Sequence, residues 1–268
     1  MRRTLVLVYG SIAYAMFVGV FLYAMGFMAN AFVPKSIDVG AGLLGGPALA
    51  VNLGLLALFA LQHSVMARPT FKRWWTQFVP QEIERSTYVL ASNVLMIALF
   101  VLWQPMPAIV WNVDNAIGRI ALWSLFGLGL GLVLVTTFLI NHFDLFGLRQ
   151  VWLAWRGRPY GELRFVQPAV YRLVRHPLYV GWMIAFWVTP TMTVGHLLFA
   201  AVTTAYMLVA IQFEERNLIE FHGEKYREYR HRTPMLIPVP RRKAAKTRIA
   251  SAAPVAPAAA PVATTTTA

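Results

Sequence analysis

The chain has 268 residues, of which 58% are hydrophobic and only 13% are charged. Because a soluble domain carries roughly 25% charged residues, this composition excludes an ordinary soluble protein and indicates an integral membrane protein. The lack of cysteine excludes disulfides, thiolate metal sites and cysteine nucleophiles, and the net charge of +13 is better explained by anionic lipid head groups than by nucleic acid. We therefore expect membrane lipids as partners, and no nucleic acid.

The first apolar run covers residues 5–32 and follows Arg2 and Arg3. It is longer than the roughly 20 residues that a transmembrane helix needs. A signal peptide is the alternative, because residues 29–31 (Ala-Asn-Ala) resemble a cleavage site. The apolar region of a signal peptide covers only about 7 to 15 residues, so the run predicts a retained transmembrane helix.

Further apolar runs at residues 47–66, 86–103 and 117–140 predict additional membrane spans. In the last of these runs, Gly127 and Gly131 have the spacing G-x-x-x-G. Two small residues one turn apart let another helix approach closely, so this pair predicts a helix-packing face.

The C-terminal part contains a long, mostly apolar segment at residues 178–213, interrupted by Pro190 and Gly195. Its length predicts a hairpin of two short helices joined by a tight turn. Residues 213–231 carry many charges and predict an amphipathic helix. The sequence therefore predicts an all-α, polytopic helical membrane protein with five to six transmembrane helices, including this C-terminal hairpin.

These elements predict a single membrane domain over residues 1–240, followed by an Ala/Pro/Thr-rich tail at residues 241–268 that we expect to be disordered. Lys and Arg are distributed unevenly between the loops. Six of them lie within residues 149–175, none lies at the hairpin tip and ten follow Phe213. By the positive-inside rule, this alternation predicts six crossings with both termini in the cytoplasm.

The predicted hairpin brings its two ends together, so Arg175 and His176 should lie beside Glu214 and Glu215 at the cytoplasmic face. A charged side chain at the centre of a span is opposed by roughly 2.5 to 3.5 kcal/mol, so such residues usually bind or react, although a cluster that only anchors helices is the alternative. Carboxylates suit a cationic group, Arg and His suit a carboxylate, and aromatic rings suit a sulfonium. The pattern fits S-adenosylmethionine, but by itself it indicates a zwitterionic ligand and no more.

The motifs R-H-P-x-Y-x-G, E-E-x-x-L and G-E-x-Y-x-x-Y, within residues 167–238, resemble the C-terminal signature of the isoprenylcysteine carboxyl methyltransferases and phospholipid methyltransferases. One departure is His222, where these enzymes usually have an aromatic or apolar residue before the glycine. The resemblance implies S-adenosylmethionine as methyl donor, no metal, and a cofactor site under the membrane surface. The residues that it assigns to this site are Arg175, His176, Pro177, Tyr179, Gly181, Glu214, Glu215, Leu218 and Tyr226.

Within that group, residues 141–152 and the chain length resemble the bacterial methanethiol S-methyltransferases. This resemblance implies methyl transfer to the sulfur of methanethiol, a small thiol, in a bacterial inner membrane, and no obligate protein partner is evident. Because an aliphatic thiol is largely protonated at neutral pH, a base is expected. We expect His142 or Asp144 to take the proton and Arg149 to support the thiolate, although these residues could also merely cap the preceding helix.

Other interpretations remain open at this point. A methyltransferase that acts on a phospholipid amine or a prenyl-cysteine carboxylate has the same C-terminal motifs. A haem-binding protein could use His63, His142 and His196 as axial ligands. A non-enzymatic scaffold would leave Arg175 and Glu215 as topology anchors.

Overall fold

Long apolar helices dominate the computed structural model, which describes residues 1–43, 45–161 and 167–238. The predicted tail at residues 241–268 lies outside the described residues. Among the described residues, five segments are long and apolar enough to cross a membrane: α1 (Arg2–Ala29), α2 (Gly45–Ala67), η1 with α4 (Gln81–Leu102), α5 (Ala116–Ile140) and α9 (Val194–His222). The predicted all-α, polytopic membrane protein is thereby confirmed.

The shorter elements connect or extend these helices, and the longest of them, α8 (Pro177–Trp187), packs along α5. They are α3 (Pro69–Trp75), η1 (Gln81–Ile83), α6 (His142–Leu145), α7 (Leu148–Trp155), η2 (Ala169–Arg172), α8 (Pro177–Trp187), α10 (Glu224–Arg232), and the strands β1 (Ile109–Asn112) and β2 (Thr191–Thr193). Helices suit this sequence because hydrocarbon offers no partner to a free backbone N–H or C=O group. Large apolar side chains face outward, as at Leu5, Leu61 and Leu128, which are 68%, 63% and 68% exposed, and this outer surface is suited to lipid.

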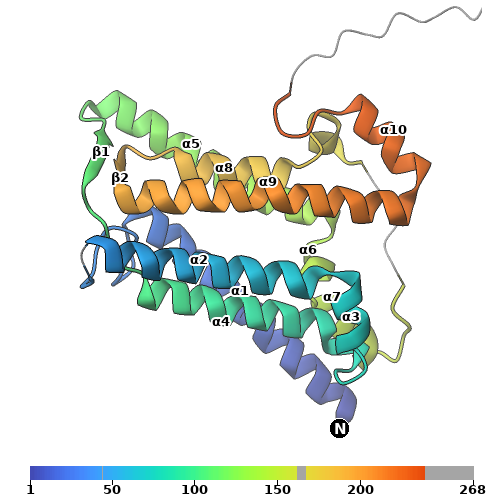
Figure 1. The fold of residues 1–268 in the computed structure, drawn as a ribbon. Coiled ribbons are helices and arrows are strands. Elements are labelled where there is room, and N and C mark those ends of the chain that lie inside the picture. The colour runs from blue at the N-terminus through green and yellow to red at the C-terminus, as the bar shows by residue number, and fades with distance from the viewer. Residues whose placement is uncertain (44, 162–166, 239–268) are drawn as a thin grey trace, which may run out of the picture. The chain divides into compact units, whose positions relative to one another are not determined.

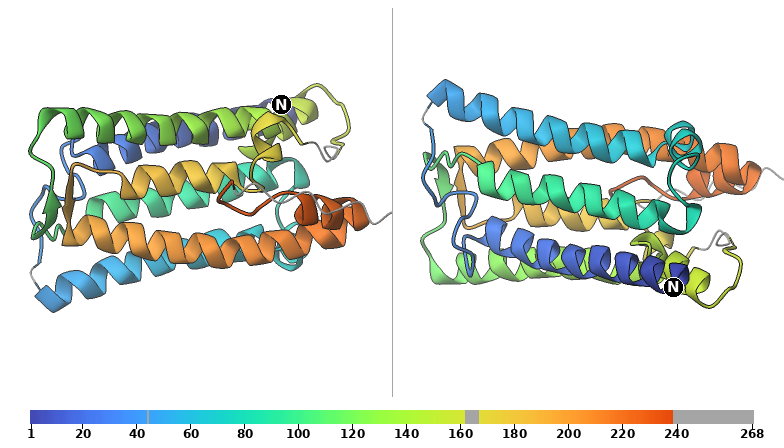
Figure 2. Two further views of the ribbon diagram at one scale, coloured as in Figure 1. Left: turned by 90° about the horizontal axis from the view of Figure 1, so that it is seen from above. Right: turned by 90° about the horizontal axis from the view of Figure 1, so that it is seen from below.

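The helices form two layers that are stacked on one another. α5, α8 and α9 make one layer and α1, α4 and α2 make the other, with α4 beneath α8 and α2 beneath α9 (Figures 1 and 2). Buried aromatic side chains fill the space between the layers, among them Phe27, Trp103, Phe186 and Phe199. The start of α1 and the end of α9 lie at the same end of the bundle, which we call the α10 end (Figure 1).

The C-terminal region differs from the predicted pair of short helices followed by a separate amphipathic helix. α8 has 11 residues, whereas α9 has 29 and continues without a break through the charged residues to His222. The helix ends at Gly223, whose φ of +58° belongs to a region that favours glycine. A helix of this length measures about 44 Å and exceeds the roughly 30 Å of a hydrocarbon core, so its charged end can reach the membrane surface.

The sixth crossing that the charge pattern predicts is not a spanning helix. α8 is about 17 Å long at 1.5 Å per residue, which is too short for the hydrocarbon core. Residues 188–193 complete the passage in extended form, and β2 pairs antiparallel with β1 at the far end of the bundle. The Val113 N–H donates to the Pro190 carbonyl at 2.9 Å, so this carbonyl of the extended segment is paired.

The predicted packing face at Gly127 and Gly131 is wrong. A Cβ atom at either position would meet no atom within 4 Å. The close approach occurs instead between α5 and α8 at Gly129 and Gly181, where a Cβ on Gly181 would lie 2.7 Å from the Gly129 carbonyl oxygen. The position of Gly181 on α8 determines which glycine of α5 makes the close contact, and the spacing of the glycines within α5 does not predict it.

This contact generates a prediction about stability. Gly129→Ala and Gly181→Ala should lower the melting temperature in detergent, because each new methyl group would overlap a backbone oxygen and overpacking costs roughly 1 to 3 kcal/mol. Gly127→Ala is the matched control and should melt at the wild-type temperature or above it, since alanine favours a helix over glycine. Equal melting temperatures for the three variants would contradict the assigned contact.

Candidate active site

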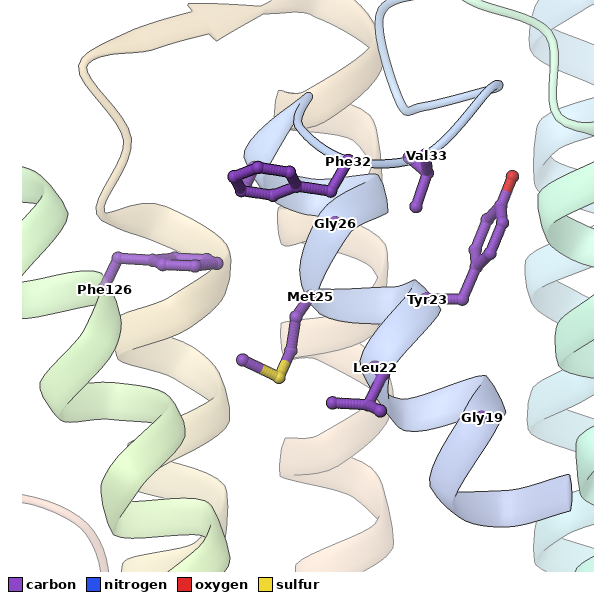
Figure 3. Close-up of a pocket in the computed structure, with 9 residues that line it drawn as sticks. Gly19, Leu22, Tyr23, Met25, Gly26, Phe32, Val33 and Phe126 are labelled. Carbon is purple, nitrogen blue, oxygen red and sulfur yellow. The ribbon is translucent and has the colours of Figure 1, made fainter. Parts of the chain in front are cut away.

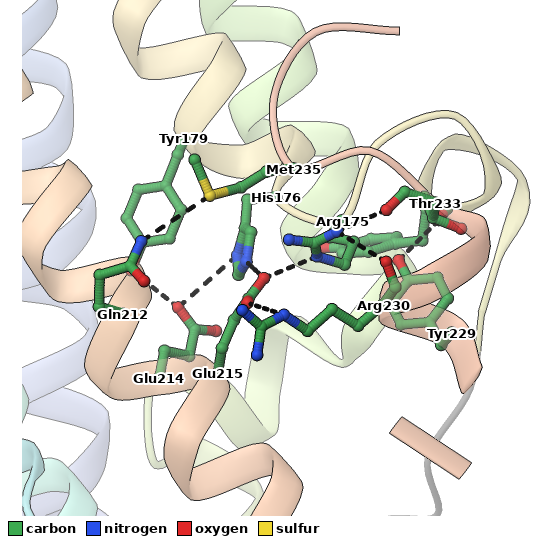
Figure 4. Close-up of polar contacts among 11 residues, drawn as sticks. Arg175, His176, Tyr179, Gln212, Glu214, Glu215, Tyr229, Arg230, Thr233 and Met235 are labelled. Carbon is green, nitrogen blue, oxygen red and sulfur yellow. Dashed lines mark hydrogen bonds and ion pairs between the residues drawn. The ribbon is translucent and has the colours of Figure 1, made fainter. Parts of the chain in front are cut away.

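The start of α8 and the end of α9 meet at the α10 end, as the sequence predicts. The Arg175 Nε–H donates to Glu215 Oε1 at 2.6 Å, and His176 Nε2 lies 3.0 Å from the same oxygen (Figure 4). These residues are about 40 positions apart in the sequence. The prediction that the two motifs are neighbours in space is therefore confirmed.

Glu215 is the buried centre of this cluster, with 2% of its surface exposed. Its second oxygen, Oε2, lies 3.1 Å from Arg230 Nε of α10. Arg175 also donates from Nη1 to the carbonyl oxygens of Arg230 and Thr233, at 3.1 and 2.5 Å. Every charged group of the cluster thus has opposite charge or carbonyl oxygens as partners, which a buried carboxylate requires.

The segment that follows α10 closes over the same cluster. The backbone N–H groups of Arg175 and His176 donate to the carbonyl oxygens of Pro234 and Met235, at 2.9 and 3.2 Å. The Tyr229 hydroxyl donates to the Tyr171 carbonyl at 2.6 Å. Arg175 and His176 are therefore held through their backbones as well as through their side chains.

Tyr226 of α10 is almost completely buried beside the cluster, with 2% exposure. Burial raises the pKa of its hydroxyl, and the nearby carboxylates of Glu215 and Glu214 raise it further. Tyr226 therefore stays a neutral phenol at physiological pH.

Glu214 has different surroundings from its neighbour Glu215. The Tyr179 hydroxyl donates to Glu214 Oε2 at 3.0 Å, and His176 Nδ1 lies 3.9 Å from that oxygen. Its side chain is 46% exposed, and among the described residues no Lys or Arg nitrogen lies within 4.0 Å of it. Glu214 is thus the carboxylate of this site that can face a cationic ligand.

The other three predicted cofactor residues have surroundings that suit a role in helix structure and packing. Pro177 is the first residue of α8, a position that suits its fixed φ and its missing N–H. Gly181 lies against α5, as described above. Leu218 is half-buried on α9, one turn beyond Glu214.

His142 lies in a shell of aromatic side chains at the start of α6, and it is 5% exposed. Its ring stacks on Phe138 with 4.2 Å between centroids. The Thr137 hydroxyl donates to the Leu134 carbonyl, so it accepts from His142 Nδ1–H at 2.8 Å, which leaves the Nε2 lone pair directed at the Tyr14 hydroxyl 2.9 Å away. Burial lowers the pKa of His142, so the ring is neutral at pH 7.

Asp144 and Arg149, the other predicted catalytic residues, form an ion pair with 2.9 Å between Nη1 and Oδ1. The Tyr160 hydroxyl donates to Asp144 Oδ2 at 3.2 Å, and the Arg149 guanidinium lies 5.1 Å from the Tyr160 ring centre. The positive charge that we expected to support a thiolate is therefore shared with Asp144. Of the three predicted catalytic residues, His142 is thus a neutral side chain, whereas Asp144 and Arg149 are paired with each other.

A second polar cluster lies between the two layers at the α10 end, and the sequence did not indicate it as a site. The Tyr88 hydroxyl of α4 lies 2.8 Å from His63 Nε2 of α2, and Ser64 donates to the Tyr206 hydroxyl of α9 at 3.2 Å. The residues belong to three helices, and no spacing within one segment predicts that they meet.

The three histidines of the haem alternative lie on different elements, and each has its own hydrogen-bond partner. His63 contacts Tyr88, His142 contacts Tyr14, and His196 Nε2 donates to the Phe186 carbonyl at 3.0 Å. Their arrangement is that of separate packed side chains.

A groove in the described part of the chain lies away from these clusters. It has a volume of about 500 Å³ and runs along the end of α1 that is remote from α10, where Leu22, Met25, Phe32 and Phe126 line it (Figure 3). Its lining is mostly apolar, and Tyr23 is the lining residue with an ionisable side chain. This lining offers no acidic or basic side chain of the kind gathered at the Glu215 cluster.

Comparison with known proteins identifies close relatives. No protein-family model matches the chain, and no solved structure is significantly similar to it. Methanethiol S-methyltransferases from Mycobacterium tuberculosis and Crocosphaera subtropica are 54% and 55% identical to it, over 90% and 89% of this chain and 99% and 93% of theirs. Nurim from Sus scrofa is 30% identical over 63% of this chain and 68% of its own length. The chain therefore belongs to the methanethiol S-methyltransferase family.

Proposed function

We propose that this protein transfers a methyl group from S-adenosylmethionine to the sulfur of methanethiol, giving dimethyl sulfide and S-adenosylhomocysteine. The observation that carries the proposal is the cluster at the α10 end, in which Glu215 is fully compensated and Glu214 is left open to a cationic ligand. The names of the relatives above support methanethiol as the acceptor.

The donor is a zwitterion with an additional sulfonium charge, and the residues of the cluster fit these groups. Glu214 would accept from the donor's ammonium group, because its carboxylate has room for a further charged partner. Arg230, whose side chain is 48% exposed, would attract the donor's carboxylate. Arg175, His176 and Glu215 would act as positioning residues, since their polar atoms are already committed to one another.

The acceptor must lose its proton as its sulfur bonds to the methyl carbon. We propose that His142 Nε2 takes this proton, because the ring is neutral and its lone pair is directed at a hydroxyl that a thiol could replace. The thiol S–H bond breaks, the sulfur forms the new S–C bond, and the electron pair of the broken S–C bond stays on the donor sulfur. Asp144 and Arg149 would hold α6 and α7 in place around His142.

We further propose that the α10 end faces the cytoplasm of a bacterial inner membrane. Lys and Arg are concentrated in the loops at this end, and such loops face the cytoplasm. S-adenosylmethionine would then enter from the cytoplasmic water phase, whereas methanethiol is small and apolar enough to arrive from either side.

The function is tested with labelled S-adenosylmethionine, the protein in sealed vesicles of both orientations, and a panel of acceptors. We expect label in dimethyl sulfide only where the α10 end faces the added donor. Long-chain thiols, prenyl-cysteine and phosphatidylethanolamine should be poor acceptors, because His142 is only 5% exposed and aromatic rings pack around it. A lipid or prenyl-cysteine as the best acceptor would refute the thiol assignment and leave the broader methyltransferase assignment.

The two adjacent glutamates should respond differently to neutralisation. Glu214→Gln should weaken donor binding about tenfold, the loss expected for one charge-assisted hydrogen bond at a half-exposed site, and it should leave the melting temperature unchanged. Glu215→Gln should destabilise the fold by roughly 3 to 5 kcal/mol, because Arg175 would remain buried without its counter-charge. Calorimetry with S-adenosylhomocysteine and thermal melting measure the two effects, and identical behaviour of the variants would contradict their separate roles.

The role of His142 predicts a pH dependence. His142→Gln should lower turnover by roughly 10²- to 10⁴-fold near pH 7, where the thiol needs a base. The defect should shrink as the pH rises, because alkali supplies the thiolate directly. The lowered pKa keeps wild-type His142 unprotonated from neutral pH upward, so the wild-type profile should be flatter. Tyr14→Phe is the matched control that retains the imidazole, and a defect of His142→Gln that is independent of pH would rule out His142 as the base.

A further inference from the structure

Two arginines from different layers of the bundle share one aromatic ring at the α10 end. Arg68 is the residue that joins α2 to α3, and its guanidinium carbon lies 3.7 Å from the centre of the Phe213 ring of α9. The guanidinium carbon of Arg216, about one turn further along α9, lies 5.6 Å from the same ring centre. Two positive charges are therefore held at one ring, which is 36% exposed.

Neither arginine has a counter-charge among the described residues. Within the described ranges, no Asp or Glu oxygen lies within 4.0 Å of either guanidinium, and neither guanidinium donates a hydrogen bond. Neighbouring cations at the same end differ in this respect, because Lys72 pairs with Glu84 at 3.8 Å and Arg230 pairs with Glu215 at 3.1 Å. The two arginines that share the ring are thus available to a negative charge from outside the chain.

The contact with the ring leaves the hydrogen-bonding capacity of these arginines unused. At 3.7 Å, the Arg68 guanidinium is at stacking distance from Phe213. A stacked guanidinium keeps its five N–H donors along its edge, where they match the oxygens of a phosphate or a carboxylate. Two nearby like charges also repel each other, and an anion between them removes that repulsion. The arrangement therefore has the chemistry of an anion-binding site.

Both arginines lie at the depth of lipid head groups. Phe213 lies about 29 Å along α9 from Val194, and Arg68 lies about 35 Å from the start of α2 at Gly45. Both helices start at the end of the bundle that is remote from α10 (Figure 1). Because a hydrocarbon core is roughly 30 Å thick, the arginines lie where the helices leave it and where lipid phosphates are found.

Exposed apolar side chains extend from the two arginines toward the middle of the bundle. Leu61 and Val65, four residues apart on one face of α2, precede Arg68 and are 63% and 39% exposed. Val209, one turn before Phe213 on α9, is 56% exposed. α2 lies beneath α9 and packs against it (Figure 1). An anion site that continues into an apolar surface fits an amphiphile better than it fits a free anion.

We propose that Arg68 and Arg216 bind the phosphate of an anionic phospholipid, whose acyl chains lie along the apolar surface of α2 and α9. The phosphate oxygens accept from both guanidinium groups, so the lipid joins the two layers at the α10 end. It also restrains Phe213 and thereby the adjacent Glu214. A zwitterionic lipid binds less well, because two arginines repel its ammonium group. The proposal goes beyond methyl transfer and does not depend on it.

The test measures binding of a fluorescent phosphatidylglycerol to the full-length protein in detergent micelles. We expect Arg68→Gln and Arg216→Gln each to weaken binding about fivefold, the contribution of one basic residue near an anionic lipid surface. Arg227→Gln is the matched control, because it removes the same charge at the same end from a residue that pairs with Glu224 at 3.4 Å. This variant should bind the lipid as the wild type does.

Competition identifies the source of the anion. Unlabelled phosphatidylglycerol should displace the probe, whereas phosphatidylcholine, inorganic phosphate and S-adenosylmethionine at the same concentration should not. Displacement by inorganic phosphate would indicate a site for free anions, and displacement by S-adenosylmethionine would assign the arginines to the donor site. Either result would overturn the lipid site, as would equal displacement by phosphatidylcholine or an equal loss of affinity in Arg227→Gln.

Thermal melting without added lipid separates a loss of binding from a loss of fold. The Arg216 side chain is exposed and has no hydrogen-bond partner among the described residues, so Arg216→Gln should melt at the wild-type temperature. This variant decides the test alone if Arg68→Gln does not fold. Wild-type affinity for phosphatidylglycerol in a folded Arg216→Gln variant would refute the proposed site.

Discussion

The buried carboxylate of Glu215 is the interaction on which the α10 end depends. An ionised carboxylate with 2% exposure is tolerated only when charge and hydrogen bonds compensate it. Arg175 and His176, directly before α8, and Arg230 of α10 supply that compensation from two different segments. The requirement to neutralise one charge therefore fixes the start of α8, the end of α9 and α10 relative to one another. Glu214 is adjacent to Glu215 and is therefore held in a defined position, although it forms no ion pair with Arg175 or Arg230.

A second constraint sets the depth of the site. The contact of Gly129 with Gly181 lets α8 lie directly against α5, and α8 begins just below the cluster at His176. α8 is too short to span the hydrocarbon core. The first turn of α8 therefore lies at the α10 end, where the Tyr179 hydroxyl donates to Glu214 at 3.0 Å.

The sequence predicts much of this organisation, and its failures have physical causes. The spans follow from apolar runs, and the proximity of Arg175 to Glu215 follows from a hairpin whose ends must meet. The different roles of Glu214 and Glu215 do not follow, because adjacent residues on a helix point in different directions and only the neighbouring segments decide which is buried. The pair of Tyr88 and His63 does not follow either, since a contact between separate helices leaves no spacing in the chain.

The proposed reaction joins a charged donor from water with a small apolar acceptor. The polar surroundings of Glu214 and the apolar surroundings of His142 match these two ligands. Glu214 lies at the charged end of α9, where Tyr179 of α8 donates to it, whereas His142 lies among phenylalanines at the end of α5. Aromatic contacts connect the two regions: Phe17 stacks on Phe146 beside His142, and Phe21 of the same helix meets Trp182 of α8 at 5.8 Å between centroids. In the proposed reaction, exclusion of water by such apolar side chains would strengthen the electrostatic contacts of the donor and leave the thiol as the nucleophile.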